Sequence, residues 1–368
     1  MTLAIADDVS LAPLTTLELG GPARHLAVIA DEATLVEALG WARARGEPVL
    51  VMGGGSNLVV ADRGFGGLVV RMANRGISFV NDGSVERLQV AAGEPWDQLV
   101  AEAVRRDLAG IECLSGIPGL VGATPIQNVG AYGQEVADCV RSVRVLDRQT
   151  LGARDLAREA CEFGYRDSVF KRQPDRWIVL GVTFELRPGG APAIRYRELE
   201  QALAAGAPGT GAGAAGSTPT LAEVRDTVLR LRRAKSMVID PTDANRRSVG
   251  SFFMNPIVSA AEAARLIAGW RAQGLVAADQ AVPQFPAPPT AAEPARDRVK
   301  LSAAWLIERA GFSKGFRRGA VGISTRHALA LVHHGGGTTT ELLALADLIQ
   351  GTVEQRLGVR LAREPVVC

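Results

Sequence analysis

Cysteine and histidine are scarce in this chain of 368 residues, and the shortage argues against several kinds of site. The four cysteines lie far apart and form no Cys-x-x-Cys pair, which fits a reducing compartment better than a disulfide framework. The four histidines match no catalytic motif. We therefore expect no metal site, and we expect small buried hydrophobic side chains at four positions: Cys113, Cys139, Cys161 and Cys368.

Long apolar runs and an excess of charge of one sign are also missing. No stretch of about 18 uninterrupted apolar residues occurs, so we expect no membrane span. The first eight residues lack a basic segment and do not resemble a signal peptide. Lys and Arg number 41 against 39 Asp and Glu, whereas nucleic-acid binding needs a concentrated basic face. These features predict a cytoplasmic protein, which we expect to be a monomer, acting on small molecules.

The residues that are present suffice for two or three domains, because 47% of them are hydrophobic. The clearest boundary is the Ala- and Gly-rich segment 204–217, which we interpret as a flexible linker or surface loop. Before it, the apolar periodicity predicts helices at 31–46 and 96–108 and strands at 48–52, 68–72, 87–92, 140–146 and 177–186.

After residue 217 the pattern is mainly helical. The Pro-rich interval 283–294 predicts a loop, and Thr residues before position 341 can cap a helix. The predicted helices are 221–235, 260–274, 299–310 and 341–357, and the predicted strands are 328–333 and 361–367.

Two glycine-rich loops are the first chemical signal. Gly53-Gly54-Gly55-Ser56-Asn57 follows a predicted strand and is either an ordinary tight turn or a cradle in which backbone N–H groups approach a diphosphate. It matches neither Gly-x-Gly-x-x-Gly nor the P-loop. The segment 117–133 is also dense in glycine and proline. Two such loops fit a long dinucleotide better than a mononucleotide.

Together with Gly93–Val100, these loops resemble the FAD domain of the UDP-N-acetylenolpyruvoylglucosamine reductases. The resemblance runs from about Thr15 to Glu364 with its motifs in order. It implies a multidomain α/β and α+β protein with an FAD-binding fold of the vanillyl-alcohol-oxidase and p-cresol-methylhydroxylase type, plus a C-terminal substrate-binding α+β domain. The resemblance implies a first FAD-binding subdomain at residues 1–72, to which residues 359–368 return. It also implies a second FAD-binding subdomain at residues 73–203 and a substrate-binding domain at residues 218–358.

The resemblance also implies a set of residues that hold FAD non-covalently. They belong to the two glycine-rich loops and comprise Gly53, Gly54, Gly55, Ser56, Asn57, Leu58, Pro118, Gly119, Gly122, Ala123, Gln127, Asn128, Gly130 and Ala131.

Three residues are catalytic candidates, although residue type alone would give each an ordinary role. Arg166 would be a surface ion pair, Ser251 a helix cap or buried polar residue, and Glu364 a solvated chain end. The resemblance implies that Arg166 binds the enolpyruvyl carboxylate, Ser251 donates a proton, and Glu364 acts with Arg166 on the enolate. Tyr165 helps to shape the site. These segments should converge on one face of the flavin.

Further residues resemble substrate contacts. Lys235 is either a cation at a helix C-terminus or a diphosphate contact of the UDP-sugar or NADPH. Tyr196 matches a mobile tyrosine of the family, Asn255 belongs to Gly-Ser-Phe-Phe-x-Asn-Pro, and Tyr132 contacts either substrate or flavin. Two positions depart from the family: Met254 stands where Lys or Thr is common, and Arg309 where Gln is common.

The implied reaction uses NADPH to reduce FAD and then reduces UDP-N-acetylglucosamine enolpyruvate to UDP-N-acetylmuramate for peptidoglycan. Two alternatives remain open. One is another FAD-dependent sugar or hydroxy-acid oxidase of the same fold, which would react rapidly with oxygen. The other is a non-enzymatic UDP-sugar sensor.

Overall fold

The computed structural model describes residues 2–206, 218–287 and 297–368. Contacts between residues divide the chain into two units, each built from separate stretches of sequence. The first unit comprises residues 1–9, 23–55 and 65–239, and the second comprises 10–22, 56–64 and 240–368. Most of the predicted linker 204–217, from residue 207 onward, lies outside the described residues and stays a prediction.

The first unit begins with a small sheet covered by a helix. Asp31 Oδ1 accepts a hydrogen bond from Thr34 N at 2.8 Å, which starts the helix, and Gly46 ends it at φ 65°. The helix buries Leu35 and Ala38 against the sheet, as its periodicity predicts. The helix is α1 (Glu32–Arg45), and the sheet has the order β1 (Ile5–Ser10), β2 (Pro22–Ile29), β5 (Phe65–Met72) and β3 (Val49–Met52).

A larger antiparallel sheet forms the rest of this unit's framework. Trp96, which is fully buried, packs on it and donates from Nε1 to Leu114 O at 3.0 Å. The predicted strands at 87–92, 140–146 and 177–186 are confirmed. The order is β12 (Ala153–Ala157), β11 (Val140–Asp147), β13 (Trp177–Pro188), β7 (Val85–Ala91) and β6 (Ile77–Asp82), with β8 (Leu108–Ala109) also paired to β13.

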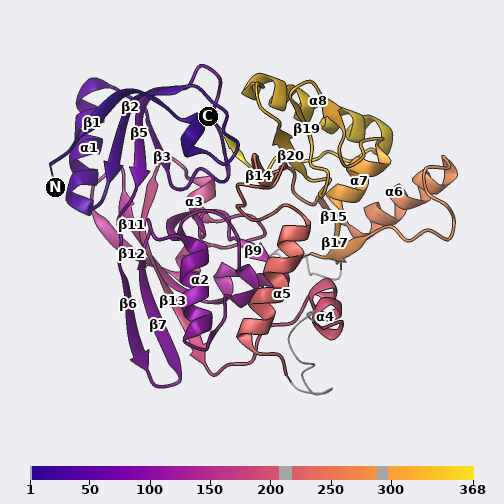
Figure 1. The fold of residues 1–368 in the computed structure, drawn as a ribbon, viewed down its shortest axis with the longest axis horizontal. Helices are drawn as coiled ribbons and strands as arrows, with labels where there is room; N and C mark the ends of the chain where they lie inside the picture. The colour runs from indigo at the N-terminus through magenta and orange to yellow at the C-terminus, as the bar shows by residue number, and fades with distance from the viewer. Residues whose placement is uncertain (1, 207–217, 288–296) are drawn as a thin grey trace. The chain divides into compact units, whose positions relative to one another are not determined.

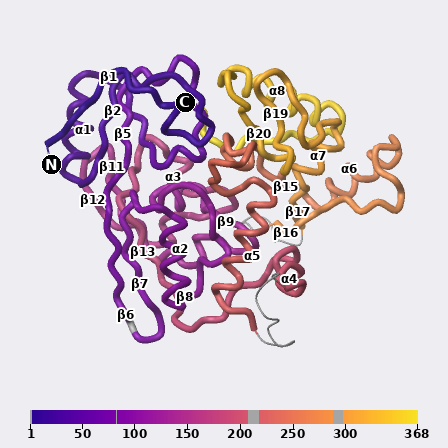
Figure 2. Tube along the Cα trace, in the orientation of Figure 1, coloured from indigo at the N-terminus to yellow at the C-terminus, as the bar shows by residue number. Residues whose placement is uncertain are grey.

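Short elements lie around this sheet. The helix predicted at 96–108 ends at Arg105, because residues 108–109 pair with β13 instead. Figures 1 and 2 show β6 and β7 as a long hairpin, with α5 beside α2. The helices are α2 (Trp96–Arg105), α3 (Val169–Arg172), α4 (Arg197–Ala204) and α5 (Leu221–Ala234), and a small hairpin joins β9 (Gly130–Ala131) to β10 (Gln134–Glu135).

Among the described residues, the second unit is built from small sheets and α-helices. One sheet has the order β14 (Ser248–Ser251), β20 (Ala330–His333), β19 (Val321–Ile323) and β18 (Arg317–Arg318). The others are β15 (Ile257–Ser259), β17 (Arg298–Leu301) and β16 (Gln284–Pro286), and the pair β4 (Leu58–Val59) and β21 (Val366–Val367). The helices are α6 (Ala260–Ala272), α7 (Ala303–Arg309) and α8 (Thr339–Leu357).

Three expectations for this unit are corrected. The helix predicted at 299–310 begins only at Ala303, because Ser302 caps it and the preceding residues form β17. Part of the loop predicted at 283–294 is a strand, β16, and residues 288–294 lie outside the described residues. The strand predicted at 361–367 is confined to Val366–Val367.

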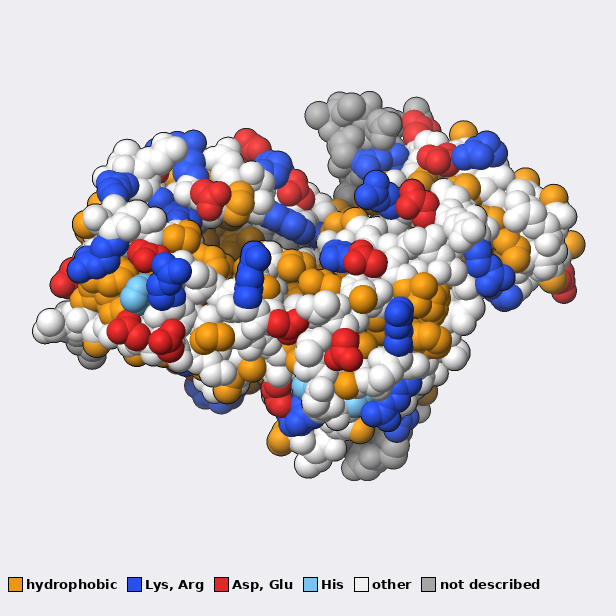
Figure 3. All heavy atoms as spheres, turned by 90° about the horizontal axis from the view of Figure 1, so that it is seen from above, with side chains coloured by type: hydrophobic (Ala, Val, Ile, Leu, Met, Phe, Trp, Pro, Cys, Tyr) orange, Lys and Arg blue, Asp and Glu red, His pale blue; other side chains and the backbone are white. Residues whose placement is uncertain are grey.

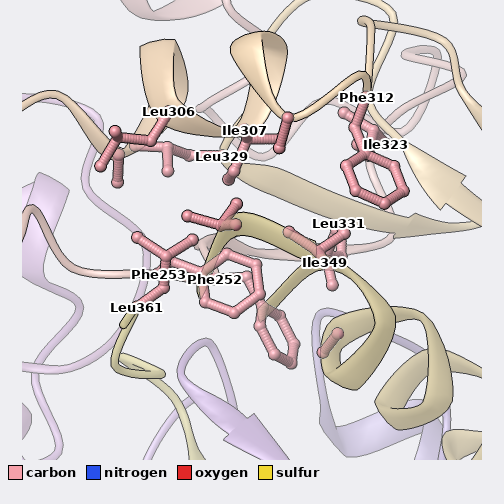
Figure 4. Close-up of a cluster of buried hydrophobic side chains, with 14 of the residues drawn as sticks. Phe252, Phe253, Leu306, Ile307, Phe312, Ile323, Leu329, Leu331, Ile349 and Leu361 are labelled. Atoms are coloured by element: carbon pink, nitrogen blue, oxygen red, sulfur yellow. The ribbon is translucent and has the colours of Figure 1, made fainter. Parts of the chain in front are cut away.

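One hydrophobic core holds the second unit together. Phe252 and Phe253 are at most 1% exposed and lie in the middle of the Gly-Ser-Phe-Phe segment. Figure 4 shows them in one cluster with Leu331 of β20, Ile349 of α8 and Leu361. Because burying one Phe contributes about 2–3 kcal/mol, this core fixes the backbone on either side of the two rings.

The surface is mixed in charge. Figure 3 shows acidic and basic side chains interspersed over the face that it draws. No helix within the described residues is both long and apolar enough to cross a membrane. Cys113, Cys139 and Cys161 are buried as predicted, and burial raises the pKa of the Cys113 thiol to about 12, whereas Cys368 is only partly buried.

Candidate active site

The two glycine-rich loops approach each other within the first unit. A Cβ added to Gly54 would lie 3.2 Å from the Cα of Gly119, and one added to Gly53 would lie 3.3 Å from Leu120 Cδ1. A side chain at position 54 would push the Gly119 backbone away by a few tenths of an ångström, so glycine allows the close approach. The first loop therefore presents bare backbone to the second, the arrangement that a diphosphate needs. Ser56 and Asn57 follow in the second unit.

The start of the second loop is held by backbone hydrogen bonds. Trp96 N donates to Gly119 O at 3.0 Å, and Gly122 N donates to Ala92 O at 2.8 Å. A Cβ on Gly122 would lie 2.5 Å from Ala92 Cβ, so only glycine fits there. These contacts fix the loop before any ligand binds, which suits a preformed cofactor site.

The end of the second loop is fixed by Asn128. This residue is 1% exposed, and its amide nitrogen donates to Glu135 Oε2 at 2.7 Å and to Gly164 O at 2.9 Å. Its oxygen accepts from Ala137 N at 3.1 Å. The side chain of Asn128 thus stabilises the protein itself, and its contact with a cofactor stays a prediction.

Arg166 lies directly against this loop. Its Nη2 donates to Gly130 O at 2.7 Å and its Nη1 to Asn128 O at 3.4 Å, while its own carbonyl accepts from Lys171 Nζ at 2.8 Å. The residue has φ 53°, the left-handed region that costs a non-glycine residue energy and is frequent at functional sites. The guanidinium lies 5.6 Å from the ring of Tyr165. Arg166 is therefore a half-buried, oriented cation.

Ser251 and Glu364 belong to neighbouring segments of the second unit. Glu364 N donates to Phe252 O at 3.0 Å, and Met254 N donates to Ala362 O at 2.9 Å. Ser251 itself pairs with Ala330 of β20. The backbone thus brings residue 251 and residue 364 together although they lie far apart in the sequence.

The hydroxyl of Ser251 is half-buried. In the part of the chain that the structure describes, it makes no hydrogen bond to another protein group. The preceding residue, Gly250, has φ 74°, which turns the strand at this point. A hydroxyl held by its backbone but not by its side chain is available to a ligand.

Helix α8 braces the segment that carries Glu364. Arg363 Nε donates to Gln350 Oε1 at 2.9 Å, and Arg363 also pairs with Asp347. Gln350 Nε2 donates to Leu361 O at 2.8 Å. Sequence reasoning did not identify Gln350 or Arg363, because a polar helix residue and an Arg near the chain end carry no local signal of this contact.

Tyr132, Tyr196 and Lys235 meet in the first unit. The two tyrosine rings pack edge to face at 5.7 Å between centroids, and Lys235 Nζ lies 5.8 Å from the centre of the Tyr132 ring. Burial raises the pKa of Tyr132 to about 12, so its hydroxyl stays protonated. Lys235 also pairs with Glu198 at 2.6 Å, a partner that the sequence did not suggest.

The remaining candidates have local contacts. Asn255 Oδ1 accepts from Ala303 N at 2.9 Å, at the start of α7. The Arg309 guanidinium lies 5.5 Å from the Trp305 ring on the same helix. These contacts explain how both side chains are oriented, and the ligand roles of Asn255 and the other candidates stay predictions.

The predicted convergence of these segments on one face of the flavin stays a prediction. Ser251 and Glu364 lie together, while Arg166 belongs to the first unit and its approach to them stays a prediction. Within the ranges 2–206, 218–287 and 297–368, no three His, Cys, Asp or Glu residues are grouped to hold a metal ion.

Two family models match the chain. Residues 23–150 match an FAD binding domain, and residues 240–368 match the C-terminal domain of UDP-N-acetylenolpyruvoylglucosamine reductase. The expected FAD-binding fold with a C-terminal domain of this type is confirmed by these matches.

Known proteins are similar over the full length. A UDP-N-acetylenolpyruvoylglucosamine reductase of Saccharopolyspora erythraea is 50% identical over 97% of this chain and 94% of its own. One from Thermobifida fusca is 47% identical over 100% of this chain and 99% of its own. The crystal structure of the enzyme from Thermus caldophilus has a TM-score of 0.63 at 25% identity, covering 100% of this chain and 99% of that one.

Proposed function

The chain belongs to the UDP-N-acetylenolpyruvoylglucosamine reductase family, and from this premise we propose how its residues carry the reaction. The activity is the FAD-dependent reduction of UDP-N-acetylglucosamine enolpyruvate with NADPH, a step of peptidoglycan biosynthesis. The product is UDP-N-acetylmuramate. The observation that supports the assignment of residues best is the pairing of the Ser251 and Glu364 segments by backbone hydrogen bonds.

The two glycine-rich loops hold the cofactor in this proposal. The close approach of Gly54 to Gly119 supports this role, because glycines leave backbone N–H groups accessible to phosphate oxygens. FAD held by these loops would supply the hydride chemistry between NADPH and the outer carbon of the enolpyruvyl double bond. Residues 1–203 supply this part, and residues 218–358 bind the UDP-sugar.

Arg166 and Glu364 act on the charge that develops beside the substrate carboxylate. Arg166 presents a planar fork that matches a carboxylate, and two loop carbonyls already orient it. A fixed cation is effective because it needs no reorganisation as the enolate forms. Glu364 acts with Arg166 in stabilising the enolate, and Tyr165 helps to shape the site.

Ser251 delivers the final proton to the adjacent carbon. A serine hydroxyl is a weak acid, but an enolate carbon is a strong base at short range. The hydroxyl is half-buried and has no protein partner among the described residues, which supports this role. A positioned acid of this kind contributes about 10²- to 10⁴-fold in rate.

Four residues recognise the substrate. Lys235 and Asn255 bind the diphosphate of the UDP-sugar, and Tyr196 and Tyr132 pack beside it. The cluster of two rings and one ammonium supports this assignment, since it combines apolar surface with a cation. We further propose that the protein acts as a monomer in the cytoplasm and that its product supports cell division.

Anaerobic NADPH oxidation tests the proposal. The yellow holoenzyme should oxidise NADPH once per flavin alone and continuously when the enolpyruvyl UDP-sugar is added. The product should carry the mass of UDP-N-acetylmuramate. Oxygen-dependent turnover without this substrate would instead favour an oxidase, and flavin-free protein that still binds UDP-sugar would favour a sensor.

A further inference from the structure

Lys235, which the proposed function assigns to the substrate diphosphate, already forms an ion pair with Glu198. Lys235 Nζ and Glu198 Oε2 are 2.6 Å apart, and both side chains are about one-third exposed, at 33% and 37%. Glu198 lies in the first turn of α4, two residues after Tyr196. A ligand anion that binds Lys235 therefore competes with this carboxylate for the ammonium.

Arg232 is a second cation near Lys235, and it forms no ion pair with any residue that the structure describes. Arg232 lies one helical turn earlier on α5 and is 8% exposed. Its Nη2 donates to Met237 O at 2.6 Å, whereas its Nε is buried and has no hydrogen-bond partner among the described residues. Asp97, the nearest carboxylate to act on it, is already bound by Arg225 at 2.7 and 2.9 Å.

These charges favour one class of anion. Glu198 neutralises Lys235 but leaves the positive charge of Arg232, so the place still attracts anions. A ligand with one negative charge would gain little by replacing a carboxylate of equal charge. A diphosphate carries more charge and more acceptor oxygens than Glu198 and therefore displaces it.

The position of α4 adds a link to Tyr196. Ala193, just before this helix, is fixed by Glu112 Oε1, which accepts from its N at 2.8 Å, and by Cys113 Sγ, which donates to its carbonyl at 3.2 Å. Glu112 is fully buried. Loss of the Glu198 contact therefore acts on the residues between Ala193 and α4, where Tyr196 stands.

We propose that Glu198 is a specificity-determining residue that holds Lys235 until a nucleoside diphosphate replaces it. The inference rests on the proposed function of Lys235 as a diphosphate contact. Glu198 thereby weakens binding of every anion at Lys235, and it weakens binding of anions with less charge than a diphosphate most. Its removal should tighten binding, which is opposite to the effect of removing an ordinary contact.

The test is titration of the FAD-loaded enzyme with UDP and with UMP, for Glu198→Gln and for Glu200→Gln as a matched control. Glu200 lies on the same turn of α4 and is exposed, so it gives the same change in net charge. We expect E198Q to bind UDP about 2- to 5-fold tighter, the range of a partly exposed ion pair. UMP, the weaker competitor, should gain by a larger factor.

E200Q should change the affinity for UDP and for UMP by less than half of the change seen in E198Q. Raising the salt concentration to about 0.5 M should reduce the effect of E198Q on both affinities. Glu198→Asp keeps the charge and should retain wild-type affinity. Equal or weaker UDP binding by E198Q, an equal gain in E200Q, or no UDP binding at all would overturn the inference. NADPH-dependent turnover of the enolpyruvyl UDP-sugar by the wild-type enzyme tests the proposed function separately. Absence of this turnover would contradict the proposed function, whereas the UDP and UMP titrations test the role of Glu198.

Discussion

In the second unit, the segments carrying Ser251 and Glu364 are joined by backbone hydrogen bonds, whereas in the first unit Tyr132, Tyr196 and Lys235 meet through side chains. Backbone contacts next to a buried core hold a group to a fraction of an ångström. Side-chain ion pairs at the surface exchange readily with ligands. The groups assigned to chemistry are thus held rigidly, and the groups assigned to recognition are held by contacts that a ligand can replace.

The largest effect should come from Glu364→Gln. This change keeps the backbone bond to Phe252 O but removes the charge, so kcat should fall about 10²- to 10³-fold, the scale of one lost electrostatic contact in a transition state. The UDP dissociation constant should stay unchanged. Stopped-flow and steady-state kinetics measure the first quantity, and Glu354→Gln on the exposed face of α8 is the control. A rise in KM with normal kcat would show that Glu364 acts in substrate binding and not in the chemistry.

A change at Lys235 should act on binding instead. Lys235→Met removes the ammonium but keeps the alkyl chain against Tyr132, so KM for the UDP-sugar should rise about tenfold or more, since a hydrogen bond to a charged group contributes about 1.5–3 kcal/mol. The rate constant kcat should change little. A kcat loss comparable to that of Glu364→Gln would show that Lys235 takes part in the chemistry and not only in recognition.

A smaller effect should follow from Gln350→Leu. The substitution removes two hydrogen bonds, to Arg363 and to Leu361 O, and each is expected to contribute about 1 kcal/mol. If Gln350 positions Glu364, kcat should fall about 3- to 10-fold at constant UDP affinity. Gln350→Glu, which keeps the acceptor for Arg363, should restore part of the rate. Loss of thermal stability with normal kcat would make the contact merely structural.

The smallest effect concerns pH and Glu18 of the second unit. Hydrogen bonds from Arg246, and then from Arg247, lower the pKa of Glu18 below its usual value of 4.5. A lowered folded pKa means that the carboxylate stabilises the fold above pH 4.5 and that this contribution is lost as pH falls through the folded pKa. Chemical unfolding should show wild type more stable than Glu18→Gln by less than about 1 kcal/mol at pH 7, since the pair is one-third exposed. The difference should shrink in acid, and a difference that grows there would contradict the assignment.

Local patterns predicted the elements whose caps and periodicity lie within a few residues. Asp31 and Gly46 mark α1 in the sequence as they do in the structure. The same reasoning extended a helix back to residue 299, because Val299 and Leu301 fit a helical face as well as a strand. Short apolar runs do not distinguish the two.

The resemblance implied that residues 359–368 return to residues 1–72, but individual pairs between distant residues could not be predicted. Val366 of β21 pairs with Leu58 of β4, and no local pattern indicates the partner of an edge strand. The contacts of Glu198 and Gln350 are of the same kind, since each depends on where another helix or segment lies. The family motifs identified Ser251 and Glu364, and the structure adds how their backbones meet.

The most direct measurement follows one turnover without oxygen. Enzyme reduced with one equivalent of NADPH is mixed with the enolpyruvyl UDP-sugar, and UDP-N-acetylmuramate is quantified by rapid quench for wild type and Ser251→Ala. The account predicts product formation at least about 10²-fold slower in the variant, with flavin reduction by NADPH unchanged. Product formation at the wild-type rate would contradict the role of Ser251 as proton donor.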